Sequence, residues 1–142
     1  MGWVSRVLTG SPDPVVDAGH TWHWTGTGFM GQVANVGTFA HRTEAGSPLY
    51  NMHELRPGDE MYVYVDGRPG DRRRFRYRIV RTDMVLNVRA SNPANAQKIL
   101  AATRYRPGTT ISVIGCAQPN GLPTSLDHRM VVTGELVDWV EL

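Results

Sequence analysis

Three residues in this sequence, a cysteine, a histidine and an arginine, have side chains that could together perform catalytic chemistry. Cys116 is the only cysteine among 142 residues, and its thiolate would be a nucleophile. His41 lies 116 − 41 = 75 residues upstream, and imidazole gives and takes protons near neutral pH. Arg129 follows the cysteine by 129 − 116 = 13 residues and offers a permanent charge to an oxyanion. These three residue types suit acyl transfer through a thioester.

The alternative for the cysteine is structural, because a lone free cysteine at a strand end is more often a small buried apolar residue. The elements around it favour chemistry. Ile111, Val113 and Ile114 are β-branched and predict a strand that ends at Cys116. A Pro/Gly/Asn-rich loop follows, and Arg129 opens a second strand. If the two strands pair antiparallel, the thiol and the guanidinium lie at the same end of the sheet.

The rest of the chain reads as many short strands with two brief helices. Fifteen glycines and nine prolines indicate frequent turns. This pattern predicts a mostly β fold, a barrel or a sandwich. The further strands are expected at Trp3–Leu8, Val33–Phe39, Glu60–Val65, Arg72–Val80 and Thr82–Val88, and the helices at Pro48–Leu55 and Ala94–Thr103.

Length and composition predict a single domain over residues 1–142. They also argue against several classes of function. The net charge of +2 is too small to indicate a nucleic-acid partner. One cysteine excludes an internal disulfide and the CxxC metal and redox motifs. The sequence has no run of about 18 apolar residues and no signal-peptide pattern, so we expect any N-terminal anchor to be absent from this chain. No cofactor is expected, and the oligomeric state is left open.

Two stretches contain residue types that could bind a ligand, a pair of histidines and a run of arginines. His20 and His23 stand three residues apart in a glycine-rich stretch that is not helical, so metal binding is not expected. The tryptophans beside them are expected to cover an edge of the core. In the segment Arg72–Val80, apolar residues alternate with arginines. We favour a solvated sheet face over an anionic partner, because no aromatic residues interleave with the arginines on their face.

The three reactive residues and their surroundings resemble the sortases, which are cysteine transpeptidases with an eight-stranded β-barrel. The run Thr38-Phe39-Ala40-His41-Arg42 resembles the family's strand ending in Gly-His. The run Ser112-Val113-Ile114-Gly115-Cys116 resembles its TLxTC strand, and Arg129 opens the strand after the next loop. The run from His23 to Val36, continued by His41-Arg42-Thr43, is most similar to class E sortases of actinobacteria. The segment GSPLYNMHELRPGDEMYVYV also resembles the family.

The resemblance implies a fold and a reaction. It implies a sortase-like eight-stranded β-barrel with one or two short helices. Cys116 would attack a peptide of the LPxTG or LAxTG kind, His41 would act as general acid and base, and Arg129 would stabilise the oxyanion or the substrate. The acyl group would pass to an amine of a cell-wall precursor or pilin. The family implies a place on the extracellular face of the cell membrane.

Two departures from the family pattern concern the substrate contact. Ala40 stands where a glycine is usual, and Gly115 stands where a threonine is usual. A threonine hydroxyl beside the nucleophile could bond the substrate backbone. Gly115 is therefore expected to slow or redirect the enzyme, and Gly115→Thr to raise its turnover.

The substrate groove is expected between two long connections, Asn87–Pro107 and Ala117–His128, because specificity usually resides in loops around a rigid sheet. Two other functions remain open. The chain could be a cysteine hydrolase that releases its product to water, or a sortase-like binding module of weak activity. The expected substrate contacts are Ala40, Gly115, Val88, Ile99, Leu122 and Leu126.

Overall fold

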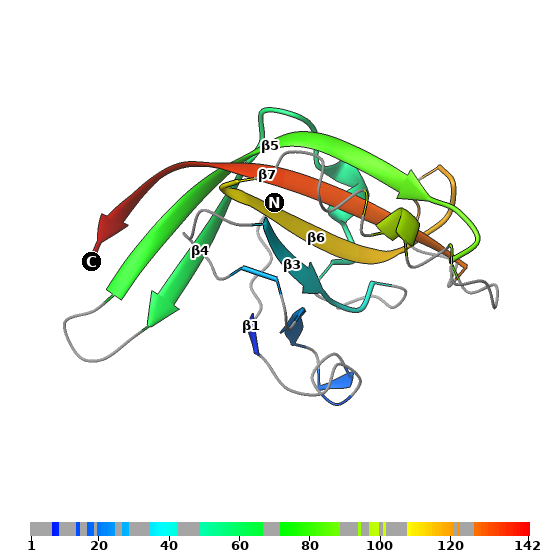
Figure 1. Ribbon diagram of the computed structural model, residues 1–142, viewed down its shortest axis with the longest axis horizontal. Helices are drawn as coiled ribbons and strands as arrows, with labels where there is room; N and C mark the ends of the chain where they lie inside the picture. Colours follow the sequence, from blue (N-terminus) through cyan, green and yellow to red (C-terminus); the bar gives the residue numbers. More distant parts are fainter. Residues whose placement is uncertain are drawn as a thin grey trace.

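The computed structural model describes residues 7–8, 14, 17–18, 20–24, 27–28, 35–42, 49–66, 72–88, 94, 97–99, 101, 108–120, 122 and 127–142. In this part of the chain seven strands form one curved sheet in the order β1-β2-β3-β6-β7-β5-β4 (Figure 1). β5 and β7 run side by side as two long arcs, with β6 next to β7 and β3 beyond β6. The strands are β1 Val7–Leu8, β2 Thr21–His23, β3 Asn35–Phe39, β4 Glu60–Asp66, β5 Arg72–Val85, β6 Thr110–Ala117 and β7 His128–Glu141.

The mostly β class is confirmed, as a curled half-barrel with few helical residues. A 3-10 helix, η1, spans Met52–Glu54, inside the stretch expected to be helical at Pro48–Leu55. Residues 94, 97–99 and 101 are helical within the second expected helix. β1–β2 and β3–β6 pair in parallel, and the other neighbours pair antiparallel.

Two expectations about strands were wrong, and one strand, β2, had not been predicted. The two strands expected at Arg72–Val80 and Thr82–Val88 are one strand, β5. A register shift between Ile79 and Arg81 reverses which residues face inward, and a β-bulge of this kind makes one strand resemble two. The strand that opens at Arg129 was expected to end at Val137 and to be followed by a short tail, but β7 continues to Glu141. β2 lies in the glycine-rich stretch that we did not expect to contain a strand.

One face of the sheet, here called the inner face, carries most of the core. Alternate residues of β6 point to it, and Val113 and Ala117 pack there with Leu49 and Met52 beside η1. Further along the same face, Ile111 packs in a second cluster with Val36, Phe75 and Tyr77. Leu49 and the helix η1 therefore cover one end of the inner face. None of the helices in the described ranges is long and apolar enough to cross a membrane.

The opposite face of β6, here called the thiol face, carries the side chains of Ile114 and Cys116. A third apolar cluster lies on it. Its buried members are Val85, Ile99, Ile114 and Val131, with Trp24, Phe39 and Val88 packed against them. The rings of Trp22, Trp24 and Phe39 contact one another with centroids 6.3–6.5 Å apart, as expected for tryptophans that cover an edge of the core.

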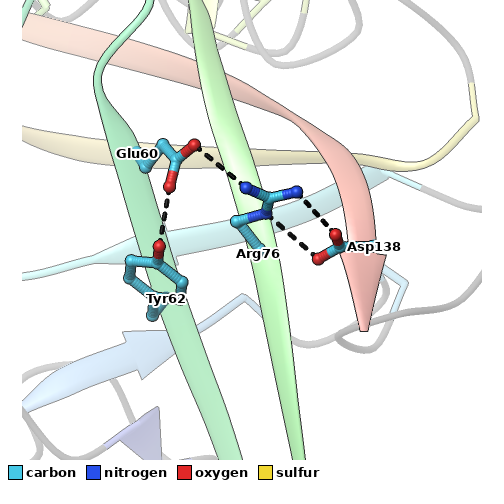
Figure 2. A network of polar contacts seen from close by, with 4 residues as sticks. All are labelled: Glu60, Tyr62, Arg76 and Asp138. Carbon is cyan, nitrogen blue, oxygen red and sulfur yellow. Dashed lines mark hydrogen bonds and ion pairs between the residues drawn. The ribbon is translucent and has the colours of Figure 1, made fainter. Parts of the chain in front are cut away.

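The arginine-rich face of β5 forms a polar network with its neighbouring strands. Figure 2 shows Arg76 between two carboxylates, donating to Asp138 of β7 and to Glu60 of β4. Tyr62 donates to the same Glu60, at 2.7 Å, and this bond raises the pKa of Tyr62. The expectation that no aromatic residue shares this face was wrong, because β4 places Tyr62 there and Arg74 lies over its ring. The favoured interpretation, a solvated face, agrees with this network.

Candidate active site

Cys116 and Arg129 lie directly opposite each other on the antiparallel strands β6 and β7. Residues opposed in this way have Cα atoms about 4.5–5.5 Å apart and side chains on the same face. That face is the thiol face, because Ile114 and Val131 form the next opposed pair and both belong to its cluster. Cys116 is partly exposed. Cys116 and Arg129 thus extend their side chains from the same face at the end of the sheet.

His41 follows the end of β3 and is level with the thiol. In the parallel pair β3–β6, each residue aligns with the one 75 positions later, from Asn35 with Thr110 to Phe39 with Ile114. The same offset places His41 level with Cys116. His41 shares the parity of Phe39, whose side chain packs on the thiol face. The three candidate residues therefore occupy neighbouring positions just after β3, near the end of β6 and near the start of β7.

A carboxylate that the sequence did not indicate contacts the histidine. Nε2 of His41 lies 2.7 Å from Oδ1 of Asp17, and since a carboxylate only accepts, Nε2–H is the donor. The two side chains are 47% and 70% exposed, so the pair contributes little to stability. Its effect is to fix the imidazole tautomer and orientation. Asp17 lies 24 residues before the histidine, and no motif connects the two.

Arg129 is held beside the start of its own strand. Its Nη1 donates to the carbonyl oxygen of His128 at 3.0 Å. His128 in turn accepts a hydrogen bond from the main-chain N–H of Asn87, 2.9 Å away. Asn87 has a left-handed backbone with φ of 58°, a conformation that asparagine tolerates better than most residues. This hydrogen bond links the residues that follow β5 to the start of β7.

The residue after the histidine, Arg42, is fully buried at 0% exposure. Its Nε donates to Leu49 O at 2.9 Å, its Nη1 to Cys116 O at 2.9 Å, and its Nη2 to His53 Nδ1 at 2.8 Å. Burial lowers the pKa of Arg42 to about 10, against attraction to Cys116 and Tyr50 that raises it. The guanidinium remains charged at neutral pH. No pattern in the sequence indicated a role for Arg42.

Ala40 and Gly115, two of the expected substrate contacts, lie on the inner side of the sheet. Ala40 is 6% exposed in the cluster with Leu49 and Met52. A Cβ atom at Gly115 would lie 2.9 Å from Met52 Sδ, 3.1 Å from Arg42 Cδ and 3.3 Å from Leu49 Cδ1. Any contact between these two residues and a peptide on the thiol face would use the main chain.

The other expected contacts are placed differently. Val88 and Ile99 both belong to the apolar cluster of the thiol face, so the structure brings them to the side of the sheet that carries the thiol. Leu122 is 44% exposed in the connection between β6 and β7. Leu126 lies outside the described residues. In the part of the chain that the structure describes, no group of three or more His, Cys, Asp or Glu could hold a metal ion.

Comparison with known proteins identifies the family. The family model "Sortase domain" matches residues 1–137. The chain belongs to the sortase family. Sortases are cysteine transpeptidases, so the solitary cysteine and its two partners are found in a family of enzymes of the expected kind. A search of curated proteins finds no match to this sortase.

Solved structures show the same fold at low sequence identity. The sortase SrtA of Actinomyces oris has a TM-score of 0.69 at 19% identity, over 95% of this chain and 71% of that one. Sortase E1 of Streptomyces coelicolor, solved with a tripeptide in its active site, has a TM-score of 0.67 at 23% identity, over 95% and 81%. Sortase E of Streptomyces avermitilis has a TM-score of 0.66 at 24% identity, over 95% and 79%. These similarities agree with the sortase fold expected from the sequence.

Proposed function

We propose that this sortase cleaves a sorting-motif peptide of the LPxTG or LAxTG kind and transfers the acyl part to an amine. The observation that carries the proposal is the pairing of Cys116 with Arg129 across β6 and β7, with His41 at the same level of the sheet. The tripeptide in the active site of the Streptomyces coelicolor relative supports a peptide substrate.

The reaction has two halves. The Cys116 thiolate attacks the carbonyl carbon of the scissile bond, and the oxyanion that forms accepts hydrogen bonds from Arg129. The C–N bond breaks as His41 gives a proton to the leaving amine, which leaves a thioester on Cys116. The incoming amine then loses a proton to His41, attacks the thioester and releases the thiolate. A bond to sulfur is replaced by a new amide bond.

Substrate contacts are proposed on the thiol face. The cluster around Val88 and Ile99 offers apolar surface beside the nucleophile, with Leu122 and Leu126 from the loop that follows β6. Ala40 and Gly115 would contribute only main-chain contacts. The acceptor is an amine of a cell-wall precursor or pilin, and the place of action is the extracellular face of the membrane, both on the strength of the family.

The experiment is a product analysis with and without an acceptor amine. The protein is incubated with sorting peptides, and products are identified by mass spectrometry. A transpeptidase forms the peptide–amine conjugate and turns over faster as the amine concentration rises. Release of free acid at a rate independent of amine would identify a cysteine hydrolase. No turnover of any peptide, together with unreactive Cys116, would indicate a binding module and overturn the proposal.

A further inference from the structure

The buried arginine next to the histidine has hydrogen bonds that the reaction chemistry alone does not require. Arg42 is fully buried, and its three acceptors in the described part of the chain are neutral: two carbonyl oxygens and an imidazole nitrogen. Burying a charge is costly unless its hydrogen bonds are satisfied. Because burial of this charge has a free-energy cost, we looked for a function of Arg42 at its position beside Cys116 and His41.

The first argument is the end of the β3–β6 ladder. The main-chain N–H of Ala40 donates to Ile114 O at 3.3 Å. In a parallel ladder the next carbonyl on that edge of β6 is Cys116 O, two residues along. That carbonyl accepts Nη1 of Arg42, a side-chain donor. The guanidinium therefore continues the ladder past the end of β3 and holds the main chain of the nucleophile.

The second argument is the link to the general acid. The main-chain N–H of Leu49 donates to His41 O at 3.2 Å, and the carbonyl oxygen of Leu49 accepts Nε of Arg42. One guanidinium thus joins the backbone of Cys116 directly to the residue that holds the backbone of His41. The spacing between the nucleophile and the acid depends on this connection.

We propose that Arg42 is a positioning residue of this sortase, which sets the spacing of His41 and Cys116 and places a positive charge behind the thiol. The inference rests on the proposed function. Arg42 would not touch the substrate, because it lies on the inner side of the sheet among Leu49 and Met52. It acts through the main chain of Cys116, whose carbonyl oxygen accepts its Nη1, and through its charge, which attracts a negative charge on Cys116.

Other titratable groups stand near the thiol or near Arg42 among the described residues. Arg129 and His128 of β7 face the end of β6, His41 follows β3, and His53 and Tyr50 lie by η1 on the Arg42 side. The test must therefore isolate Arg42 from these groups. Two substitutions separate the effect of the charge of Arg42 from that of its hydrogen bonds. Arg42→Met removes the charge and the hydrogen bonds. Arg42→Lys keeps the charge but loses the planar guanidinium that bonds several acceptors at once.

The first measurement is the rate of Cys116 alkylation by iodoacetamide from pH 5 to 9, which needs no substrate. For Arg42→Met we expect the half-maximal pH to rise by about half a unit or more, while Arg42→Lys stays with the wild type. The matched control is Arg76→Met, which removes another arginine of the sheet far from Cys116. Arg76 pairs with Asp138, which lies 138 − 129 = 9 residues along β7 from Arg129. It should leave the profile unchanged. A folded Arg42→Met variant with the wild-type profile would overturn the role of the charge.

The second measurement is steady-state turnover of a sorting peptide. For Arg42→Lys we expect kcat to fall about 10- to 100-fold with little change in KM, because the spacing of His41 and Cys116 is no longer fixed. Wild-type kcat in a folded Arg42→Lys variant would overturn the positioning role, even if Arg42→Met fails to fold. If the wild type itself cleaves no peptide, the proposed function fails, and the alkylation profile still decides the role of the charge.

Discussion

If Cys116 is the nucleophile, as proposed, its pairing with Arg129 determines where the carbonyl of a substrate must lie. Both side chains leave the same face of two neighbouring strands, so a carbonyl carbon near the thiol has its oxygen within reach of the guanidinium. Because arginine is always charged and presents several donors in a fixed plane, it can stabilise an oxyanion without waiting for a proton. The cost of replacing it measures this contribution.

Arg129→Lys tests the contribution of the fork separately from that of the charge. Lysine keeps the charge but is a flexible point donor. We expect the rate of acylation to fall about 100- to 1000-fold, the usual cost of losing an oxyanion donor, with little change in stability. Single-turnover kinetics with a sorting peptide measure it, and Arg78→Lys on the exposed face of β5 is the matched control. Full acylation by Arg129→Lys would assign the stabilising role elsewhere.

The sequence led us to expect that Gly115→Thr raises turnover. The structure predicts the opposite, a loss of stability and of turnover. The new Cβ would meet Met52 Sδ at 2.9 Å and Arg42 Cδ at 3.1 Å. Overpacking of this kind costs about 1–3 kcal/mol in the free energy of unfolding. The movement of Arg42 should also lower turnover. Urea denaturation and peptide kinetics measure the two effects.

A double-mutant cycle with Met52→Ala provides the control for that substitution. If the crowding by Met52 causes the loss, the double variant is more stable than the sum of the single losses predicts. A Gly115→Thr variant that is as stable as the wild type and faster would contradict the packing argument. It would then support a substrate contact by the hydroxyl.

At the scale of elements, much of the site was readable from the sequence. β-branched runs and turn residues located β6 and the start of β7, and antiparallel pairing of consecutive strands placed Cys116 and Arg129 together. The role proposed for Arg42 was not readable from the sequence, because it depends on the parallel register of β3 with β6, two strands far apart in the chain. β5 was read as two strands because the shift after Ile79 reverses its alternation. Asp17 carries no pattern that connects it to His41.

Exchange of the connection between β6 and β7 tests the proposed groove. Residues 119–126 would be replaced by those of a class E relative. Gln118 and Asp127 remain, because their main chains bond Leu122 O and Val88 N, at 2.7 Å each. We expect the preference between Ala and Pro at the second motif position to shift by about tenfold or more, since a methylene in an apolar pocket is worth about 1–3 kcal/mol. Ratios of kcat/KM for paired peptides measure it.

The outcome against this placement would be an unchanged preference after the exchange, combined with a changed preference after substitutions on the arginine face. Arg74→Met and Arg78→Met provide that comparison, because both residues lie on the arginine-rich face of β5, opposite Val140 and Glu135 of β7 and away from Arg129. Cys116 alkylation should be unaffected in all of these variants.

At the scale of the whole molecule, the candidate active site and the second inner cluster lie apart in the sheet. The second inner cluster, with Phe75 and Tyr77, lies toward the ends of β5 and β7 away from Arg129. Phe75→Ala should lower the free energy of unfolding by about 3–5 kcal/mol, as for other buried phenylalanines. The folded fraction should keep its Cys116 alkylation profile. Urea denaturation and alkylation under native conditions measure both, and an altered profile at unchanged fold would show that the two ends are coupled.

The most direct test of the central claim is the mass of the intact protein after brief incubation with a sorting peptide. If Cys116 is the nucleophile, the wild type gains the mass of the acyl fragment, the adduct maps to Cys116, and an added amine removes it. Cys116→Ala should keep the fold, because a partly exposed thiol contributes little packing, and should gain no mass. An adduct on another residue, or joining of peptide to amine by Cys116→Ala, would contradict the account.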